Sequence, residues 1–132
     1  MTSKWEELQL EDKLIDILRH SQGHPQKHHF ELPFLTAYQL AISFAQQYPN
    51  DALSLGYEHI GGKGIGTQTS LAQYLAGQLS VRIKEGSIKN VEGRFLSNQH
   101  LKEISFNNGG EPIVSSLTDS QFPLSMFRYV EV

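Results

Sequence analysis

The sequence predicts an α+β fold, with three to four helices followed by a short C-terminal antiparallel β pair in a winged-helix-like arrangement. Three segments before residue 87 carry apolar residues at helical spacing together with helix start or stop signals. Beyond that point the pattern changes to short apolar runs of the kind that form strands. The 132 residues are 39% hydrophobic and 19% charged, which is ordinary globular composition, so one domain over 1–132 is expected.

The first predicted helix runs from Trp5 to about Ser21. Acidic side chains fill its early turns, where the helix dipole favours negative charge. Gly23 and Pro25 follow it and are expected to end it. Its apolar residues recur at helical spacing and form one amphipathic face: Leu10, Leu14, Ile17 and Leu18.

The second predicted helix, over 36–48, has the best-marked start. Thr36 and Gln39 have the spacing of a reciprocal capping box, and Leu35 and Leu40 occupy the positions of a hydrophobic staple. Pro49 is expected to stop this helix. A broad apolar stripe predicts that it lies in the middle of the core: Ala37, Leu40, Ala41, Phe44, Ala45 and Tyr48.

A long connection over 50–69 separates this helix from the next. It is rich in glycine, although Leu53, Leu55 and Tyr57 favour a short strand or turn at its beginning. The third helix is predicted over 70–85, because Ser70 is followed by Gln73 at capping-box spacing and Gly86 stands where a helix C-terminus favours glycine.

The last third of the chain predicts shorter elements. A strand is expected within 88–96, then a short helix capped by Ser97 or Asn98, then a turn over 107–110. Two further strands are expected over 113–117 and 126–132. Pro123 favours a late start or an edge position for the last strand.

Composition excludes several classes of protein. The chain has no cysteine, so it holds no disulfide, no cysteine-ligated zinc or iron–sulfur cluster and no catalytic thiol. No apolar run is long enough to cross a membrane, and 1–18 alternates acids with leucines where a signal peptide would be basic and then apolar. A cytoplasmic protein with no membrane partner is therefore expected.

Charge is divided unevenly along the chain. The net charge is −4 over 1–59, +3 over 60–105 and −2 over 106–132, although the whole chain carries only −3. A basic middle third predicts a local anion-binding face, because more distant charges are screened beyond about 10 Å at ordinary salt. The alternative is that these cations are scattered and solvated.

The glycine-rich run 61–70 leads directly into the third helix and is the most suggestive candidate site. Helix N-termini present unpaired N–H groups to anions, and Lys63, Thr67, Thr69 and Ser70 add donors suited to phosphate oxygens. The run matches neither the P-loop nor the dinucleotide-binding glycine pattern, so neither kind of nucleotide enzyme is supported. The alternative is a tight loop that binds nothing.

Histidines and carboxylates provide weaker signals. His20, His24, His28 and His29 lie close in sequence, but glycine and proline interrupt the helix that would align them. We read them as a solvated connection and predict no metal and no cofactor. Carboxylates such as Glu58 and Glu103 could serve acid–base chemistry, yet no catalytic motif accompanies them, so an enzyme is not favoured.

The favoured hypothesis is a nucleic-acid-binding module of the helix-turn-helix or winged-helix type. It requires the middle cations to gather around the helix start at residue 70, although the connection preceding that helix is long for this class. Nine residues would contact phosphate or base edges: Lys63, Thr67, Thr69, Ser70, Gln73, Arg82, Lys84, Lys89 and Arg94.

The main alternative is a protein-interaction or regulatory module without catalytic activity, with a protein partner or a second copy docking on an exposed apolar helix face or the edge of the 126–132 strand. Aromatic residues Phe122, Phe127 and Tyr129 motivate it, unless they complete the protein's own core.

A third hypothesis is an enzyme that holds a phosphorylated small molecule in the glycine-rich loop.

Overall fold

The computed structural model describes residues 3–21, 32–57, 59–61, 70–97, 99–101, 103–114 and 124–131. Its helices are α1 (Lys4–Glu7), α2 (Leu10–Arg19), α3 (Ala37–Gln47), α4 (Pro49–Leu55) and α5 (Leu71–Glu85). Its strands are β1 (Leu35–Thr36), β2 (Val91–Leu96), β3 (Ser105–Phe106), β4 (Ile113–Val114) and β5 (Leu124–Tyr129). The predicted α+β class is confirmed.

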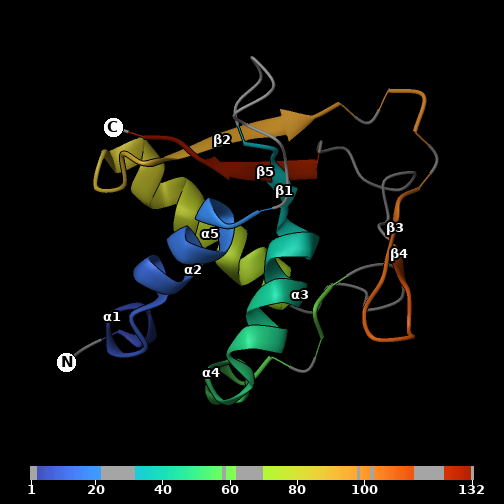
Figure 1. The fold of residues 1–132 in the computed structure, drawn as a ribbon, viewed down its shortest axis with the longest axis horizontal. Coiled ribbons are helices and arrows are strands. Elements are labelled where there is room, and N and C mark those ends of the chain that lie inside the picture. The colour runs from blue at the N-terminus through green and yellow to red at the C-terminus, as the bar shows by residue number, and fades with distance from the viewer. Residues whose placement is uncertain are drawn as a thin grey trace.

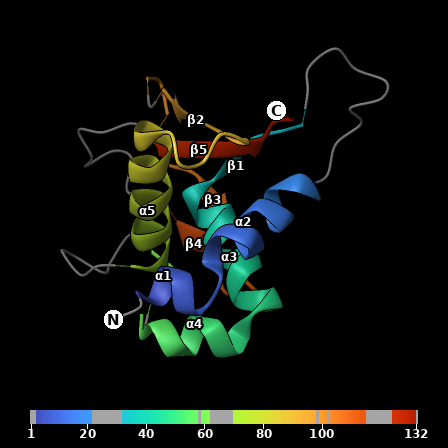
Figure 2. The ribbon, with the colours of Figure 1, turned by 90° about the vertical axis from the view of Figure 1, so that its left-hand side faces the viewer.

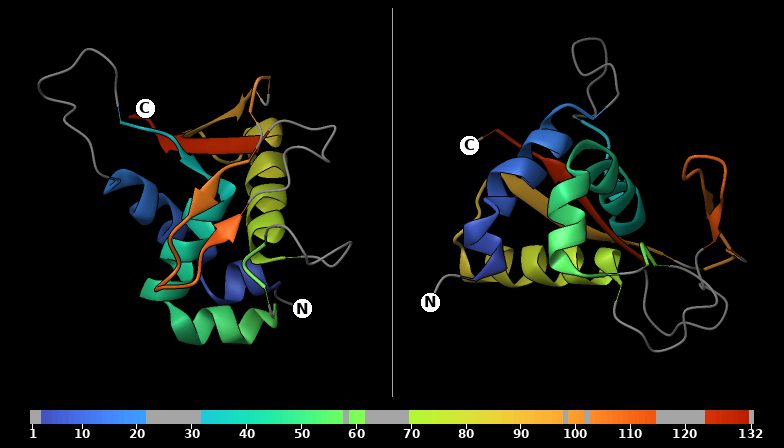
Figure 3. Two further views of the ribbon diagram at one scale, coloured as in Figure 1. Left: turned by 90° about the vertical axis from the view of Figure 1, so that its right-hand side faces the viewer. Right: turned by 90° about the horizontal axis from the view of Figure 1, so that it is seen from below.

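Two layers organise the molecule, a three-stranded sheet and the helices packed on one side of it (Figures 1 and 2). The sheet has the order β1-β5-β2, and β5 is antiparallel to both neighbours. Strands β3 and β4 form a separate two-stranded sheet beside the helices (Figure 3). Phe106 of this small sheet stacks on Tyr38 of α3, with ring centroids 5.1 Å apart.

The core lies between the helices and the sheet. Phe44 of α3 and Phe127 of β5 are the largest of its fully buried side chains. The apolar faces of α2, α3 and α5 pack around these two rings. Burial of one face of each helix accounts for the regular helical spacing of apolar residues in the sequence. The leucines on these faces are fully buried: Leu10, Leu14, Leu18, Leu40, Leu75 and Leu79.

Both predicted capping boxes are present. Thr36 Oγ1 accepts from the backbone N–H of Gln39 at 3.2 Å, and the Gln39 side chain accepts from the N–H of Thr36 at 2.8 Å. Gly86 ends α5 with φ +81°, the left-handed conformation that glycine adopts without penalty. These local signals set the boundaries of α3 and α5 as predicted.

The predicted first helix is instead two helices. Gln9 adopts a left-handed conformation with φ 53° and separates α1 from α2. The break allows Trp5 on α1 and Leu10 on α2 both to be buried. A single straight helix was the wrong prediction, because the sequence around Gln9 contains no proline or glycine to announce the turn.

The connection after α3 contains a helix that the sequence did not predict. Pro49 ends α3 but also occupies the first turn of α4, where its missing N–H costs nothing. The expected strand or turn at Leu53–Tyr57 is therefore wrong over most of its length. Leu53 is 78% exposed, so the apolar residues that suggested a strand do not belong to one buried face.

The C-terminal strands belong to two sheets, whereas one short antiparallel pair was predicted. β2 and the turn at Gly109–Gly110 are confirmed, but no short helix occupies the described residues between 97 and 106. β4 pairs with β3, whereas β5 pairs with β1 and β2. The prediction that the last strand lies at an edge was wrong, because β5 is the central strand of its sheet. This strand begins at Leu124, directly after Pro123 in the sequence.

Candidate functional site

The amino end of α5, where the sequence placed a phosphate site, already uses its backbone donors internally. The N–H of Leu71 donates to His59 O, and that of Ala72 donates to Ile60 O, both at 2.9 Å. The N–H of Gln73 donates to Ser70 Oγ at 3.1 Å. The unpaired N–H groups that make a helix start attractive to anions are therefore satisfied within the protein.

Ser70 and Gln73 together form the capping box of α5. Ser70 is only 4% exposed, and its own N–H donates to the Gln73 side chain at 3.4 Å. Both halves of the capping box are occupied. Lys63, Thr67 and Thr69, the other residues assigned to this end of the helix, lie outside the described residues.

Arg82 and Lys84 lie at the opposite end of α5. Eleven residues separate Leu71 from Arg82, which at the rise of an α-helix is about 17 Å. The guanidinium of Arg82 stacks over the Trp5 ring, 4.2 Å from its centroid. Charges at this distance are largely screened from the helix start, so α5 does not gather the predicted cations.

Lys89 and Arg94 follow α5 and complete the predicted set. Lys89 is exposed in the turn that leads into β2. Arg94 lies in β2, where its guanidinium forms a 3.0 Å ion pair with Glu92 and donates to the carbonyl of Gly93 at 2.8 Å. Lys84 and Arg94 line one groove between α5 and the sheet, so the structure brings two of the predicted cations together, but away from the start of α5.

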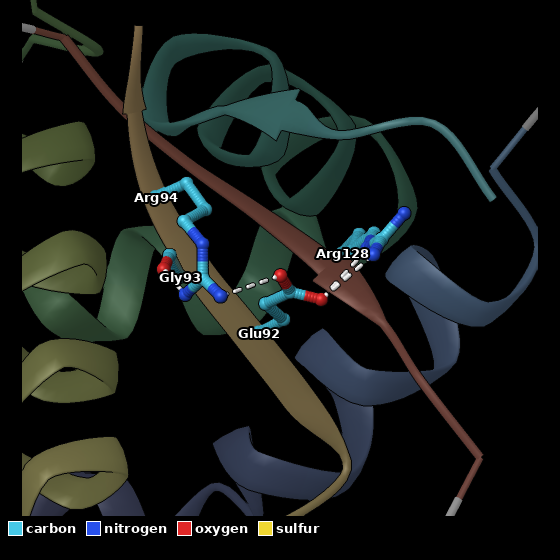
Figure 4. A network of polar contacts seen from close by, with 4 residues as sticks. All are labelled: Glu92, Gly93, Arg94 and Arg128. Atoms are coloured by element: carbon cyan, nitrogen blue, oxygen red, sulfur yellow. Dashed lines mark hydrogen bonds and ion pairs between the residues drawn. The ribbon is translucent and has the colours of Figure 1, made fainter. Parts of the chain in front are cut away.

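Glu92 links two arginines on the face of the sheet that the helices leave uncovered (Figure 4). Arg128 of β5, its cross-strand neighbour, donates to one carboxylate oxygen from Nε at 3.0 Å and from a terminal nitrogen at 2.8 Å. Arg94 pairs with the other oxygen. Val91, on the opposite face of β2, is buried against the helices. This network occupies the charges that an anion would otherwise meet.

The outer edge of β2 is the most accessible backbone in the described sheet. β2 ends the strand order, so only its inner edge pairs. Val130 N donates to Asn90 O at 3.0 Å, in continuation of the β2–β5 register. Because facing groups alternate along an antiparallel pair, Val91, Gly93 and Phe95 direct their backbone groups away from β5.

Phe95 makes this edge unusual. The residue is 69% exposed, although Val91, on the same face of β2, is 4% exposed. A shallow groove of about 330 Å³ lies between β2, β5 and the second half of α5. Phe95 and Phe127 contribute aromatic surface to the groove, which is lined by Ser80, Ile83, Lys84, Gly93, Arg94, Phe95, Ser125 and Phe127. An aromatic ring beside an unpaired strand edge is a feature of peptide-binding sheets.

The opposite edge of the sheet offers much less backbone. β1 contains only Leu35 and Thr36, and Thr36 immediately caps α3. Short edge strands are a common way in which proteins prevent unwanted pairing. Among the described strands of the larger sheet, β2 alone provides a long free edge.

Other candidates are weaker. A second cavity of about 400 Å³ is lined by Gly61, Glu103, Pro112, Ile113 and Val114. The described residues contain no group of three or more histidines and acids able to hold a metal ion. His24, His28, His29 and Glu58 lie outside the described residues. Of the helices that the structure describes, none is long and apolar enough to cross a membrane.

The docking edge at β2 was not predicted from the sequence, although the sequence contains a signal for it. A strand was predicted around Val91 and Phe95, but the docking edge was assigned to the last strand. Phe127 is instead buried, so it completes the protein's own core, while Phe122 lies outside the described residues. The alternation of Val91, Gly93 and Phe95 with charged neighbours was the available clue, but only the strand order shows which strand is at the edge.

Comparison of the chain with models of protein families, with curated proteins and with solved structures finds no match.

Proposed function

We propose that this protein is a protein-interaction module that binds an extended protein segment along the outer edge of β2. The observation that carries the proposal is Phe95, a residue that is 69% exposed beside backbone groups that β5 does not pair. Burying one aromatic side chain stabilises a complex by about 1.5–3 kcal/mol. A segment added to β2 would cover the ring and pair its outward-facing backbone groups in the same step.

The chemistry of the edge supports binding rather than catalysis. The groove beside it is shallow and mainly apolar, and its charged lining residues are the two cations Lys84 and Arg94. Among the described residues that line it there is no carboxylate and no histidine. A chain without cysteine suits the reducing cytoplasm, which is where we propose that the module acts.

The proposal is tested by selecting binders from a phage-displayed library of random peptides on the wild-type protein and on Phe95→Asp. A charge at an edge position opposes strand addition. Selected peptides should bind the wild type, lose at least about tenfold in affinity on the variant, and shift the amide resonances of Val91, Gly93 and Phe95. Peptides that bind both proteins equally, or no selected peptide at all, would reject the proposal.

The nucleic-acid hypothesis, with its winged-helix likeness, stays a prediction, and three of its proposed contact residues, Lys63, Thr67 and Thr69, lie outside the described residues. Titration of a labelled duplex at two salt concentrations tests it, because phosphate contacts weaken steeply with salt. Binding that weakens with salt and is reduced by Lys63→Ala would support it. Absent or salt-independent binding would remove it.

A further inference from the structure

We infer that the partner of the β2 edge is a second copy of this chain, joined by antiparallel β2–β2 pairing about a two-fold axis at Gly93. The inference rests on the proposed function, since it names the segment that the edge binds. It is carried by the sequence of β2, Val-Glu-Gly-Arg-Phe-Leu, whose charges become complementary when the strand is paired with itself.

The register follows from the backbone. Val91, Gly93 and Phe95 present the outward-facing groups, so the pairing that satisfies all three places Gly93 opposite Gly93 of the second copy. Val91 then lies opposite Phe95, and Phe95 opposite Val91. Each outward-facing N–H and C=O of these residues gains a partner, and each exposed Phe95 comes to lie against the edge strand of the second copy.

The same register pairs opposite charges on the uncovered face. Glu92 lies opposite Arg94 of the second copy, and Arg94 lies opposite its Glu92, so the two-fold axis generates two cross-strand ion pairs. Opposite charges at facing positions stabilise antiparallel pairs, whereas like charges destabilise them. A shift of the register by two residues would lose this matching, so the charges also specify the alignment.

Gly93 lies at the centre of this pairing. Its carbonyl accepts from its own neighbour Arg94, whose side chain is 64% exposed, so pairing would exchange this contact and the Arg94–Glu92 pair within the chain for an Arg94–Glu92 pair across the axis. Pairing would join two three-stranded sheets into one six-stranded sheet.

The experiment measures self-association by sedimentation equilibrium of the full chain over a wide concentration range. A single strand pair buries less surface than a standard interface, so a weak, concentration-dependent dimer is expected. Arg94→Glu places Glu opposite Glu at both positions and should raise the dimer dissociation constant by about tenfold or more. Lys4→Glu is the matched control, since it reverses a charge on α1, where Lys4 contacts only Ser54 in the described structure, and should leave the constant unchanged.

A charge-exchange pair makes the test specific. The double variant Glu92→Arg/Arg128→Glu keeps an intrachain ion pair in reversed order but makes both edge charges of β2 positive. It should also dimerise weakly. Mixed with Arg94→Glu, however, it should form a heterodimer at least about tenfold tighter than either variant forms with itself, because every facing pair is again opposite in charge.

Hydrogen exchange of the wild type provides a measurement that depends on no variant. The amides of Val91, Gly93 and Phe95 should exchange more slowly as concentration rises. A wild type that stays monomeric at every concentration, amides whose exchange ignores concentration, or a mixture that binds no tighter than its components would overturn the inference. If library peptides still bind β2 under those results, the proposed function stands and only the identity of the partner is wrong.

Discussion

Individual polar residues in this protein are mostly engaged in its own structure. Ser70 and Gln73 cap α5, Arg82 covers Trp5, and Glu92 holds Arg94 and Arg128. Sequence patterns identified several of these residues as possible ligand contacts because capping and anion binding use the same donors and acceptors. Their role was decided by neighbours distant in the chain, such as the carbonyl of His59 at the start of α5.

Removal of the α5 cap should be measurable. Ser70→Ala removes the acceptor for the N–H of Gln73, and the free energy of unfolding should fall by about 1 kcal/mol. Urea denaturation measures the loss. Ser80→Ala, an exposed position within the same helix, is the control and should change stability by less than about 0.5 kcal/mol. Equal stability of the two variants would show that the cap contributes nothing.

Tyr38 gives the stability a dependence on alkaline pH. Burial raises the pKa of its phenol, so the folded state holds the proton more tightly than the unfolded state. This contribution is fully present below the unfolded pKa of about 10 and is lost as pH rises above that value and through the higher pKa of the folded state. Denaturation at neutral pH and above pH 10 should show a smaller alkaline loss for Tyr38→Phe than for the wild type. An unchanged loss would contradict the assignment.

At the scale of elements, capping signals predicted where two helices begin. They did not predict the break between α1 and α2 or which strands pair. The boxes at Thr36 and Ser70 predicted α3 and α5 almost to the residue. The division at Gln9 was missed because no proline or glycine marks it. The helix begun by Pro49 was missed although proline in its first turn and Gly56 after its end are local signals. Strand β1 has two residues, too few for any periodicity to reveal.

The break between α1 and α2 suggests a stabilising substitution. Gln9 has φ 53°, a conformation that costs a residue with a Cβ about 1–2 kcal/mol. Gln9→Gly should raise the free energy of unfolding by roughly 0.5 kcal/mol, since glycine's greater entropy loss offsets part of the gain. Thermal unfolding measures the shift. Gln9→Ala is the control and should give no increase; a destabilised glycine variant would refute the argument.

At the scale of the whole molecule, one core joins helices and sheet while the charges remain dispersed. The buried faces of α2, α3 and α5 meet β5 through Phe127, and this arrangement places β5 at the centre and β2 at the edge. The position of β2 leaves Phe95 exposed. The candidate docking edge is therefore a consequence of strand order and not of any local motif.

Core packing should dominate stability. Leu79 of α5 is fully buried, so Leu79→Ala should lower the free energy of unfolding by about 2–5 kcal/mol through lost burial and a cavity. Leu53→Ala, at a position 78% exposed, should cost less than about 0.5 kcal/mol. Denaturant titration compares the two. Similar losses would mean that the described core is wrong.

The sequence by itself determined the α+β class, the starts of α3 and α5, the end of α5 and the strand at β2, because these depend on contacts within a few residues of one another. It also excluded thiol chemistry. Tertiary structure alone decided that Arg82 stacks over Trp5, that β5 is central and that Phe95 is exposed at an edge. Distances between elements arise from how their apolar faces pack, and no spacing along the chain encodes which strand a given strand will meet.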